Sequence, residues 1–236
     1  MHCDFLHVTI PESHAAVVLR GVLDAMGSLG AVSVSPDLHR LGGGTVKFSE
    51  GRGFSMVGIS GQVLDHLRLN GELSRSLHLF GSSPHRVTRV DVAHDVACSA
   101  PPVLRRLLRS ARSGSISLTR KSLRSQSIRF IDNHNHYAPG DRTGTLYLGS
   151  RTAKVYARVY DKRNERLDRG FDDPGNLLRY ELTVTGKLSP TLRDVVEPAP
   201  MFWKFMSDVL PPPANVSDWV GGADGFDISA PVALLP

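Results

Sequence analysis

Hydrophobic and polar residues alternate along several short stretches of the chain, which predicts β-strands. The clearest is 88–96, where Arg89, Asp91 and Asp95 share one face and valines with His94 take the other. Similar patterns predict strands at 5–10, 54–59, 145–148, 154–160 and 178–185. Short strand segments are also expected near 32–34, at 46–48 and between 116 and 131.

Apolar residues at helical spacing are less frequent. They predict helices at 12–29, 62–69, 101–112 and 198–210. Residues 132–144 form a predicted polar loop, and 164–175 a charged loop that could include one helical turn. Strands outnumber helices and seldom alternate with them one to one. The pattern therefore predicts an α+β fold with a mainly antiparallel central sheet.

The amino-acid composition limits the class of protein and the cellular compartment to be expected. The chain has 236 residues, 41% of them hydrophobic and 22% charged, as in an ordinary globular domain. We expect one domain over residues 1–197, followed by a short helix and a poorly ordered tail over 198–236. Two cysteines favour a reducing cytoplasm, and no apolar stretch has the length of a membrane span. A net charge of +5 favours a polyanionic partner.

One predicted strand carries tyrosines among basic residues. Its period of two places five side chains on one face: Lys154, Tyr156, Arg158, Tyr160 and Lys162. A phenol has a pKa near ~10, so it attacks poorly at neutral pH unless nearby cations favour the phenolate. This face could hold a tyrosine nucleophile for a phosphodiester. Alternatively, the tyrosines simply suit a half-buried sheet.

Three acidic residues on predicted strands are candidate metal ligands. Asp91 and Asp95 lie four residues apart, roughly 13 Å along a strand, so they do not readily bind one ion. A metal site that needs no bend in the strand combines Asp91 with Glu181 from another strand. Asp95 would complete this site or lie beside it. Oxygen ligands suit Mg²⁺ or Mn²⁺. Alternatively, these acids form ion pairs with Arg89 and Arg179.

A basic run without any acid extends from Ser99 to Ile131. It contains Arg105, Arg106, Arg109, Arg112, Arg120, Lys121, Arg124 and Arg129. Such a patch favours salt-dependent contacts with DNA phosphates, the alternative being a solvated cationic face. Arg105, Arg109 and Arg112 share one helical face. We also expect Arg151 and Lys154 to hold a phosphate near the scissile bond. Since no glycine-rich phosphate loop is present, use of ATP or a dinucleotide is not expected.

Three motifs resemble, in this order, the replication initiation factor family: RVDVAHD, YLGSRTAKVYARVYDKRNE and LLRYELTVTG. That family serves rolling-circle plasmids and filamentous phages and includes relaxases of conjugative elements. The resemblance spans roughly residues 4 to 190. It implies a sheet with helices on one side and the active face on the other. It also points to Tyr160, in the VYDK segment, as the nucleophile, with Tyr156 as runner-up.

The activity implied by the resemblance is metal-dependent nicking of one strand at a double-strand DNA origin. Tyr160 would hold the 5′ end as a phosphotyrosine, and the free 3′-hydroxyl would prime synthesis by host proteins such as a helicase and a polymerase. A second transesterification would rejoin the strand. Arg158, Lys162 and Arg179 would neutralise charge in the transition state. Two alternatives are a relaxase with the same chemistry and a DNA-binding protein without catalysis.

Overall fold

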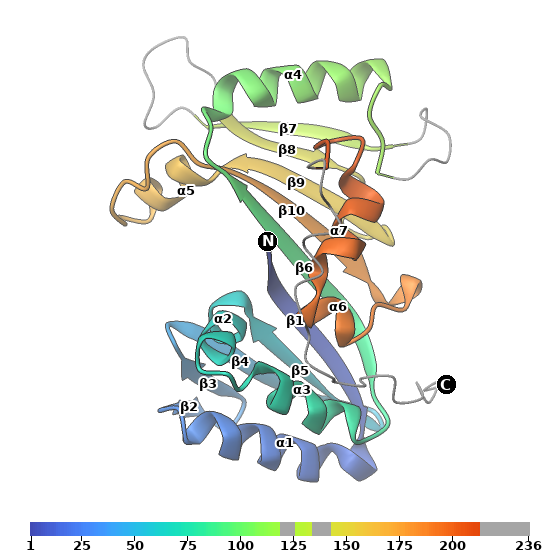
Figure 1. The fold of residues 1–236 in the computed structure, drawn as a ribbon. Helices are drawn as coiled ribbons and strands as arrows, with labels where there is room; N and C mark the ends of the chain where they lie inside the picture. The colour runs from blue at the N-terminus through green and yellow to red at the C-terminus, as the bar shows by residue number, and fades with distance from the viewer. Residues whose placement is uncertain (119–125, 134–142, 213–236) are drawn as a thin grey trace. The chain divides into compact units, whose positions relative to one another are not determined.

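The computed structural model describes residues 1–118, 126–133 and 143–212. Within them the chain forms ten strands and seven α-helices, and the strand pairs with a defined register are antiparallel (Figure 1). This confirms the predicted α+β class. The chain folds as two compact units. We call them the N-terminal unit (His2–Val92 and Val184–Pro200) and the tyrosine unit (Ala93–Thr183 and the segment that begins at Met201).

The N-terminal unit is a sheet covered by helices. Its strands follow the order β2 (Val32–Ser35), β3 (Leu38–Leu41), β4 (Gly44–Gly51), β5 (Phe54–Ser60), β1 (His2–Pro11) and the first part of β6 (Arg86–Val96). Helices α1 (Glu12–Gly27) and α2 (Gly61–Leu69) pack against β1 and β5, and α3 (Leu73–Gly81) packs on both helices (Figure 1). The short helix α6 (Arg193–Val196) also contacts β1.

The core of this unit follows from strand alternation. Leu6 and Val8 of β1 pair in register with Ile59 and Val57 of β5, and all four side chains are buried. Val22 of α1 is also buried, on the apolar stripe that its helical spacing predicted. The apolar side chains of the helix and of the strands therefore form a common core on one face of the sheet.

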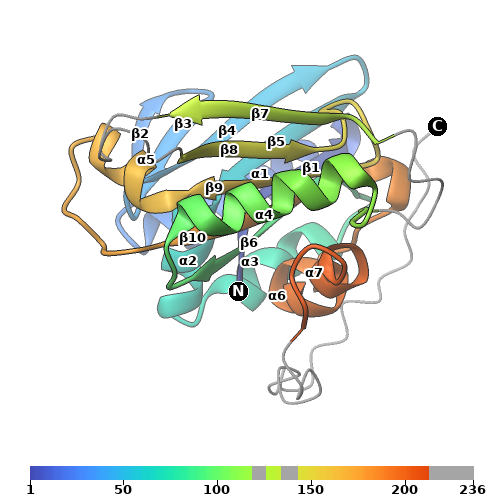
Figure 2. The same ribbon diagram turned by 90° about the horizontal axis from the view of Figure 1, so that it is seen from above.

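The tyrosine unit begins with the second part of β6 and continues through four further strands. Their order is β10 (Leu178–Thr185), β9 (Val155–Asp161), β8 (Thr143–Leu148) and β7 (Ile128–Asn133). Helix α4 (Ala100–Ser113) packs against β7, β8 and β9 and runs along β8 and β9 when seen from above (Figure 2). Helix α5 (Lys162–Asp168) follows β9 directly, and α7 (Pro198–Met206) brings Phe202 and Trp203 against His94.

The packing of α4 determines which face of β8 and β9 is open. Leu104 and Leu107 of α4 are buried, as are Leu146 of β8 and Val159 of β9. These apolar side chains pair with one another across the helix–sheet interface, since α4 lies on these two strands. The residues that alternate with them, including Tyr160, therefore face away from α4.

Several elements differ from the prediction. The strand β3 and the helices α3 and α6 were not predicted. The predicted loop 164–175 was expected to hold one helical turn, and the structure has a longer helix there, α5, over Lys162–Asp168. Its sequence has no apolar period, and it forms because the Asp161 side chain caps it. Residues 134–142 of the predicted loop and most of the predicted tail lie outside the described residues.

Candidate functional site

Three side chains from β9 and β10 meet on the face that is turned away from α4. The guanidinium of Arg158 forms an ion pair with Oε1 of Glu181, and the hydroxyl of Tyr160 donates to Oε2 at 3.4 Å. Glu181 is only 1% exposed, whereas 31% of the Arg158 side chain is exposed. Sequence alternation placed Arg158 and Tyr160 on one face, and the structure adds Glu181 from the neighbouring strand.

Two cations flank the ring of Tyr160. The Cζ atom of Arg158 lies 5.7 Å from the ring centroid, and Nζ of Lys162 lies 5.8 Å from it. Burial disfavours the charged guanidinium of Arg158, but the facing Glu181 carboxylate more than offsets this and raises the pKa of Arg158 above its ordinary value. Arg158 therefore stays charged. Both cations are also paired with acids, Arg158 with Glu181 and Lys162 with Glu165.

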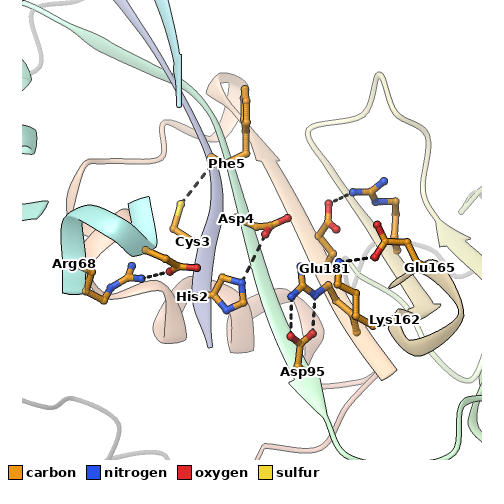
Figure 3. Close-up of polar contacts among 12 residues, drawn as sticks. His2, Cys3, Asp4, Phe5, Arg68, Asp95, Lys162, Glu165 and Glu181 are labelled. Carbon is orange, nitrogen blue, oxygen red and sulfur yellow. Dashed lines mark hydrogen bonds and ion pairs between the residues drawn. The ribbon is translucent and has the colours of Figure 1, made fainter. Parts of the chain in front are cut away.

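A second ion pair joins β10 to β6 on the same face. Nε and Nη2 of Arg179 donate to the two carboxylate oxygens of Asp95 at 2.6 and 2.7 Å (Figure 3). Arg179 stands two residues before Glu181 on β10, so both side chains point to one side of the sheet. The bidentate geometry holds Arg179 in a fixed orientation.

Asp161 anchors the chain directly after Tyr160. Its buried carboxylate accepts hydrogen bonds from Thr143 Oγ1 at 2.7 Å and from the Asn164 backbone N–H at 2.9 Å. The second bond is the N-cap of α5. At the start of α5, Nζ of Lys162 lies 2.6 Å from a carboxylate oxygen of Glu165 (Figure 3). These contacts position Tyr160 and Lys162, and the sequence reasoning did not single out Asp161.

The three predicted metal ligands each pair with an arginine. Asp91 belongs to the N-terminal unit and accepts from Nε of Arg89 at 2.8 Å, while Asp95 and Glu181 belong to the tyrosine unit. The pairs of Asp91 with Arg89 and of Asp95 with Arg179 follow the ion-pair alternative that the sequence left open, whereas Glu181 pairs with Arg158. The residues 1–118, 126–133 and 143–212 contain no group of three or more histidine, cysteine or acidic side chains arranged to hold a metal ion. The donors suit Mg²⁺ or Mn²⁺ in type, because all three are carboxylates.

The described tyrosines have different environments. Tyr156 and Tyr180 are buried, with 7% and 2% exposed. Burial raises the pKa of Tyr180 to about 12, which disfavours its phenolate. Tyr147 lies beneath two arginines, with the Cζ atoms of Arg129 and Arg151 at 5.1 and 5.6 Å from its ring centroid. Among the tyrosines that the structure describes, only Tyr160 combines partial exposure with a carboxylate and two cations.

The predicted DNA-binding residues fall on different surfaces. Arg105, Arg109 and Arg112 are exposed on α4 together with Arg106, and α4 covers the face of the sheet opposite Tyr160. Arg151 and Lys154 are exposed between β8 and β9. Arg120, Lys121 and Arg124 lie outside the described residues. The α4 arginines and Tyr160 therefore do not share one surface.

Comparisons with known proteins agree with the sequence motifs. A structure of a rolling circle replication initiator protein from Geobacillus stearothermophilus is similar, with a TM-score of 0.50, 17% identity, and coverage of 86% of this chain and 84% of that chain. At this identity the likeness concerns the fold. No curated protein matches the chain. Among the helices that the structure describes, none has the length and hydropathy needed to cross a membrane.

A family model also matches the part of the chain that contains the three motifs. The family is described as replication initiation factor, and the match covers residues 85–197, from β6 to α6. All the candidate catalytic residues lie in this range. The resemblance to the replication initiation factor family that the motifs indicated is confirmed over these residues.

Proposed function

We propose that this chain is a rolling-circle replication initiator that nicks one DNA strand with Tyr160 as the nucleophile. The observation that carries the proposal is the position of the Tyr160 hydroxyl, which donates to the buried carboxylate of Glu181 while Arg158 and Lys162 flank its ring. A phenol needs such an environment to react at neutral pH, since it must be oriented and its phenolate must be favoured.

In the proposed reaction the Oη–phosphorus bond of Tyr160 forms as the bond from phosphorus to the 3′ oxygen breaks. The phenolic proton leaves to solvent, and the departing 3′ oxygen takes up a proton from solvent. The product is a 5′-phosphotyrosine with a free 3′-hydroxyl, and attack by a 3′-hydroxyl later reverses the step. Arg158 and Lys162 stabilise the charge that develops on phosphorus, and Arg179 contributes from the neighbouring pair.

The proposed metal is Mg²⁺ or Mn²⁺, for which Glu181 and Asp95 of the tyrosine unit would supply carboxylate oxygens. When bound, such an ion withdraws electron density from the phosphate and makes phosphorus more electrophilic. The arginines that now pair with these acids would turn toward the phosphate. Arg158 is suited to this, because its buried Nε has no hydrogen-bond partner within the described part of the chain.

The proposed partner is DNA, first as a duplex origin and then as a single strand. The exposed arginines of α4 would contact duplex phosphates, and Arg151 and Lys154 would hold the strand near the reacting phosphate. Host proteins such as a helicase and a polymerase would then extend the 3′-hydroxyl in a bacterial cytoplasm.

A matched pair of variants tests the nucleophile. Wild type, Tyr160→Phe and Tyr156→Phe are incubated with supercoiled DNA of the element that encodes the chain, with Mg²⁺, Mn²⁺ or a chelator. We expect wild type and Tyr156→Phe to convert supercoiled to open-circular DNA and to form a covalent adduct that mass spectrometry maps to Tyr160. Tyr160→Phe should bind DNA without forming the adduct.

Two outcomes would contradict the proposal. If wild type binds this DNA but never nicks it with either metal, the chain is a binding protein on the same scaffold. If Tyr160→Phe retains the adduct and Tyr156→Phe loses it, the nucleophile is the buried tyrosine instead.

A further inference from the structure

A row of side chains crosses three strands of the tyrosine unit and ends at the candidate site. Arg129 on β7 pairs in register with Tyr147 on β8, and Tyr147 pairs with Arg158 on β9. The ion pair of Arg158 with Glu181 extends the row to β10. Neighbouring strands lie ~4.8 Å apart, so the row from Arg129 to Arg158 is about 10 Å long at the backbone.

The row lies on the open face of the sheet. Tyr147 alternates along β8 with Leu146 and Leu148, which are fully buried on the side of α4. Arg151, from the turn that follows β8, joins the row by placing its guanidinium over the ring of Tyr147. Two cations that approach one ring at 5.1 and 5.6 Å are held by its electron-rich face.

These two cations have no acidic partner in the part of the chain that the structure describes. Within the described residues, neither Arg129 nor Arg151 pairs with a carboxylate, and both are exposed. A guanidinium stacked on an aromatic ring keeps its N–H groups free at the rim, where they can donate to phosphate oxygens in pairs. The row therefore places guanidinium N–H donors between the edge strand β7 and Tyr160, where they could bind an anionic chain.

We infer that the row formed by Arg129, Tyr147 and Arg151 binds the sugar-phosphate backbone of single-stranded DNA and leads it across β7 and β8 to Arg158 and Tyr160. The inference rests on the proposed nicking function. A single strand suits the row better than a duplex, because an unpaired strand can bend onto a sheet face and can place a base against an aromatic or guanidinium plane.

Equilibrium binding to two probes tests this path. All variants carry Tyr160→Phe, so that no covalent step interferes, and the probes are a short fluorescent oligo(dT) strand and a mixed-sequence duplex. Loss of two phosphate contacts from a single strand changes the slope of log affinity against log salt by about 1.4. We therefore expect Arg129→Gln/Arg151→Gln to bind oligo(dT) roughly 20-fold more weakly at about 0.1 M salt, with a correspondingly shallower slope.

The matched control is Arg105→Gln/Arg109→Gln, which removes the same charge from the opposite face of the sheet. It should keep the wild-type salt slope for oligo(dT) and lose affinity mainly for the duplex. The inference is overturned if both double variants weaken oligo(dT) binding equally, or if Arg129→Gln/Arg151→Gln weakens only duplex binding. Circular dichroism and urea unfolding confirm that each variant is folded.

The result can be separated from the fate of the nicking proposal. If wild type forms no adduct but the salt slopes change as expected, the strand path stands and the chemistry fails. If wild type forms the adduct at Tyr160 and the slopes do not change, the chemistry stands and the strand path fails.

Discussion

The Tyr160 hydroxyl donates a hydrogen bond of 3.4 Å to Oε2 of Glu181, whose other carboxylate oxygen is engaged by Arg158. A carboxylate that is already paired with a guanidinium is a weak base, so Glu181 is suited to orienting the phenol rather than removing its proton. The cations beside the ring are Arg158 of β9 and Lys162 of α5, on either side of Tyr160 along the chain. Glu181 of β10 thus orients the hydroxyl, and the cations come from β9 and α5.

Removing Arg158 should destabilise the fold. Glu181 is 1% exposed, so Arg158→Met leaves a buried carboxylate without its countercharge. Breaking such a pair costs about 3 kcal/mol, and we expect that loss in the free energy of unfolding measured with urea at pH 7. The double variant Arg158→Met/Glu181→Leu should recover most of the loss, because no buried charge remains.

The control for this prediction is Arg163→Met. Its partner Asp173 is exposed, so solvent screens this pair and its loss should cost clearly less than the loss of the buried pair. Equal losses in Arg158→Met and Arg163→Met would show that the buried pair has no special role in stability.

Asp161→Ala should weaken both the cap of α5 and the attachment of β8. The variant loses the N-cap bond from Asn164 and leaves the hydroxyl of Thr143, a buried residue, without its acceptor. Together these changes should lower the free energy of unfolding by about 2–3 kcal/mol. Asp161→Asn keeps an acceptor oxygen and should lose clearly less in the same urea titration. If the two variants lose the same amount, the carboxylate does not act through these hydrogen bonds.

Gly144→Ala should be poorly tolerated, because β7 passes very close to this position. A Cβ atom at Gly144 would lie 2.0 Å from the backbone oxygen of Ile131, and a backbone atom cannot move aside easily. We expect a fall in the thermal midpoint that corresponds to at least ~2 kcal/mol. Gly27→Ala, at the end of α1, has open space around its Cβ and should change stability by less than about 1 kcal/mol. Similar midpoints for the two variants would contradict this packing.

The N-terminal unit should lose stability in mild acid through His7. Burial, and then the charge of Arg89, lowers the pKa of His7 below its ordinary value of 6.5. The unfolded chain therefore binds a proton that the folded chain does not, and the contribution of His7 is present above pH 6.5 and lost as pH falls through the folded-state pKa. His7→Gln should reduce the slope of stability against pH below 6.5, by less than about 1.4 kcal/mol per pH unit.

His14→Gln is the matched control. The imidazole of His14 shares an exposed hydrogen bond with the hydroxyl of its neighbour Ser13. Urea titrations between neutral pH and mild acid compare the three proteins. A slope unchanged in His7→Gln would mean that another group causes the acid sensitivity.

Local sequence patterns predicted most strands and the longer helices well. The strand at 178–185 was confirmed with its bounds, and the strand containing Tyr160 was displaced by one residue. The strand containing Tyr160 has one face that is fully buried and one that is partly open, so a period of two was sufficient there, whereas 178–185 is buried on both faces. The pattern missed α3 and β3, and it indicated only one turn of α5, which Asp161 caps. A polar helix of this kind leaves no apolar period in the sequence.

The residues of the candidate site were also largely predicted, but their pairing was not. Tyr160, Arg158 and Glu181 were all named from motifs and alternation, whereas the row through Arg129 and Tyr147 was not. The basic helix was predicted at 101–112, but its position on the opposite face from Tyr160 required the packing of α4. Sequence spacing shows which residues share a face of one element and contains no information about neighbouring strands.

The amino-acid sequence by itself determined the α+β class, the faces of individual strands and the relationship to replication initiation factors, because these depend on local periodicity and on motifs. Only the tertiary structure decided that Arg158 pairs with Glu181, that Arg179 pairs with Asp95 and that Arg129 lies beside Tyr147. The physical reason is strand register. It is set by the burial of whole apolar faces against helices such as α4, and a shift of one residue would turn every polar side chain of a strand to the other side.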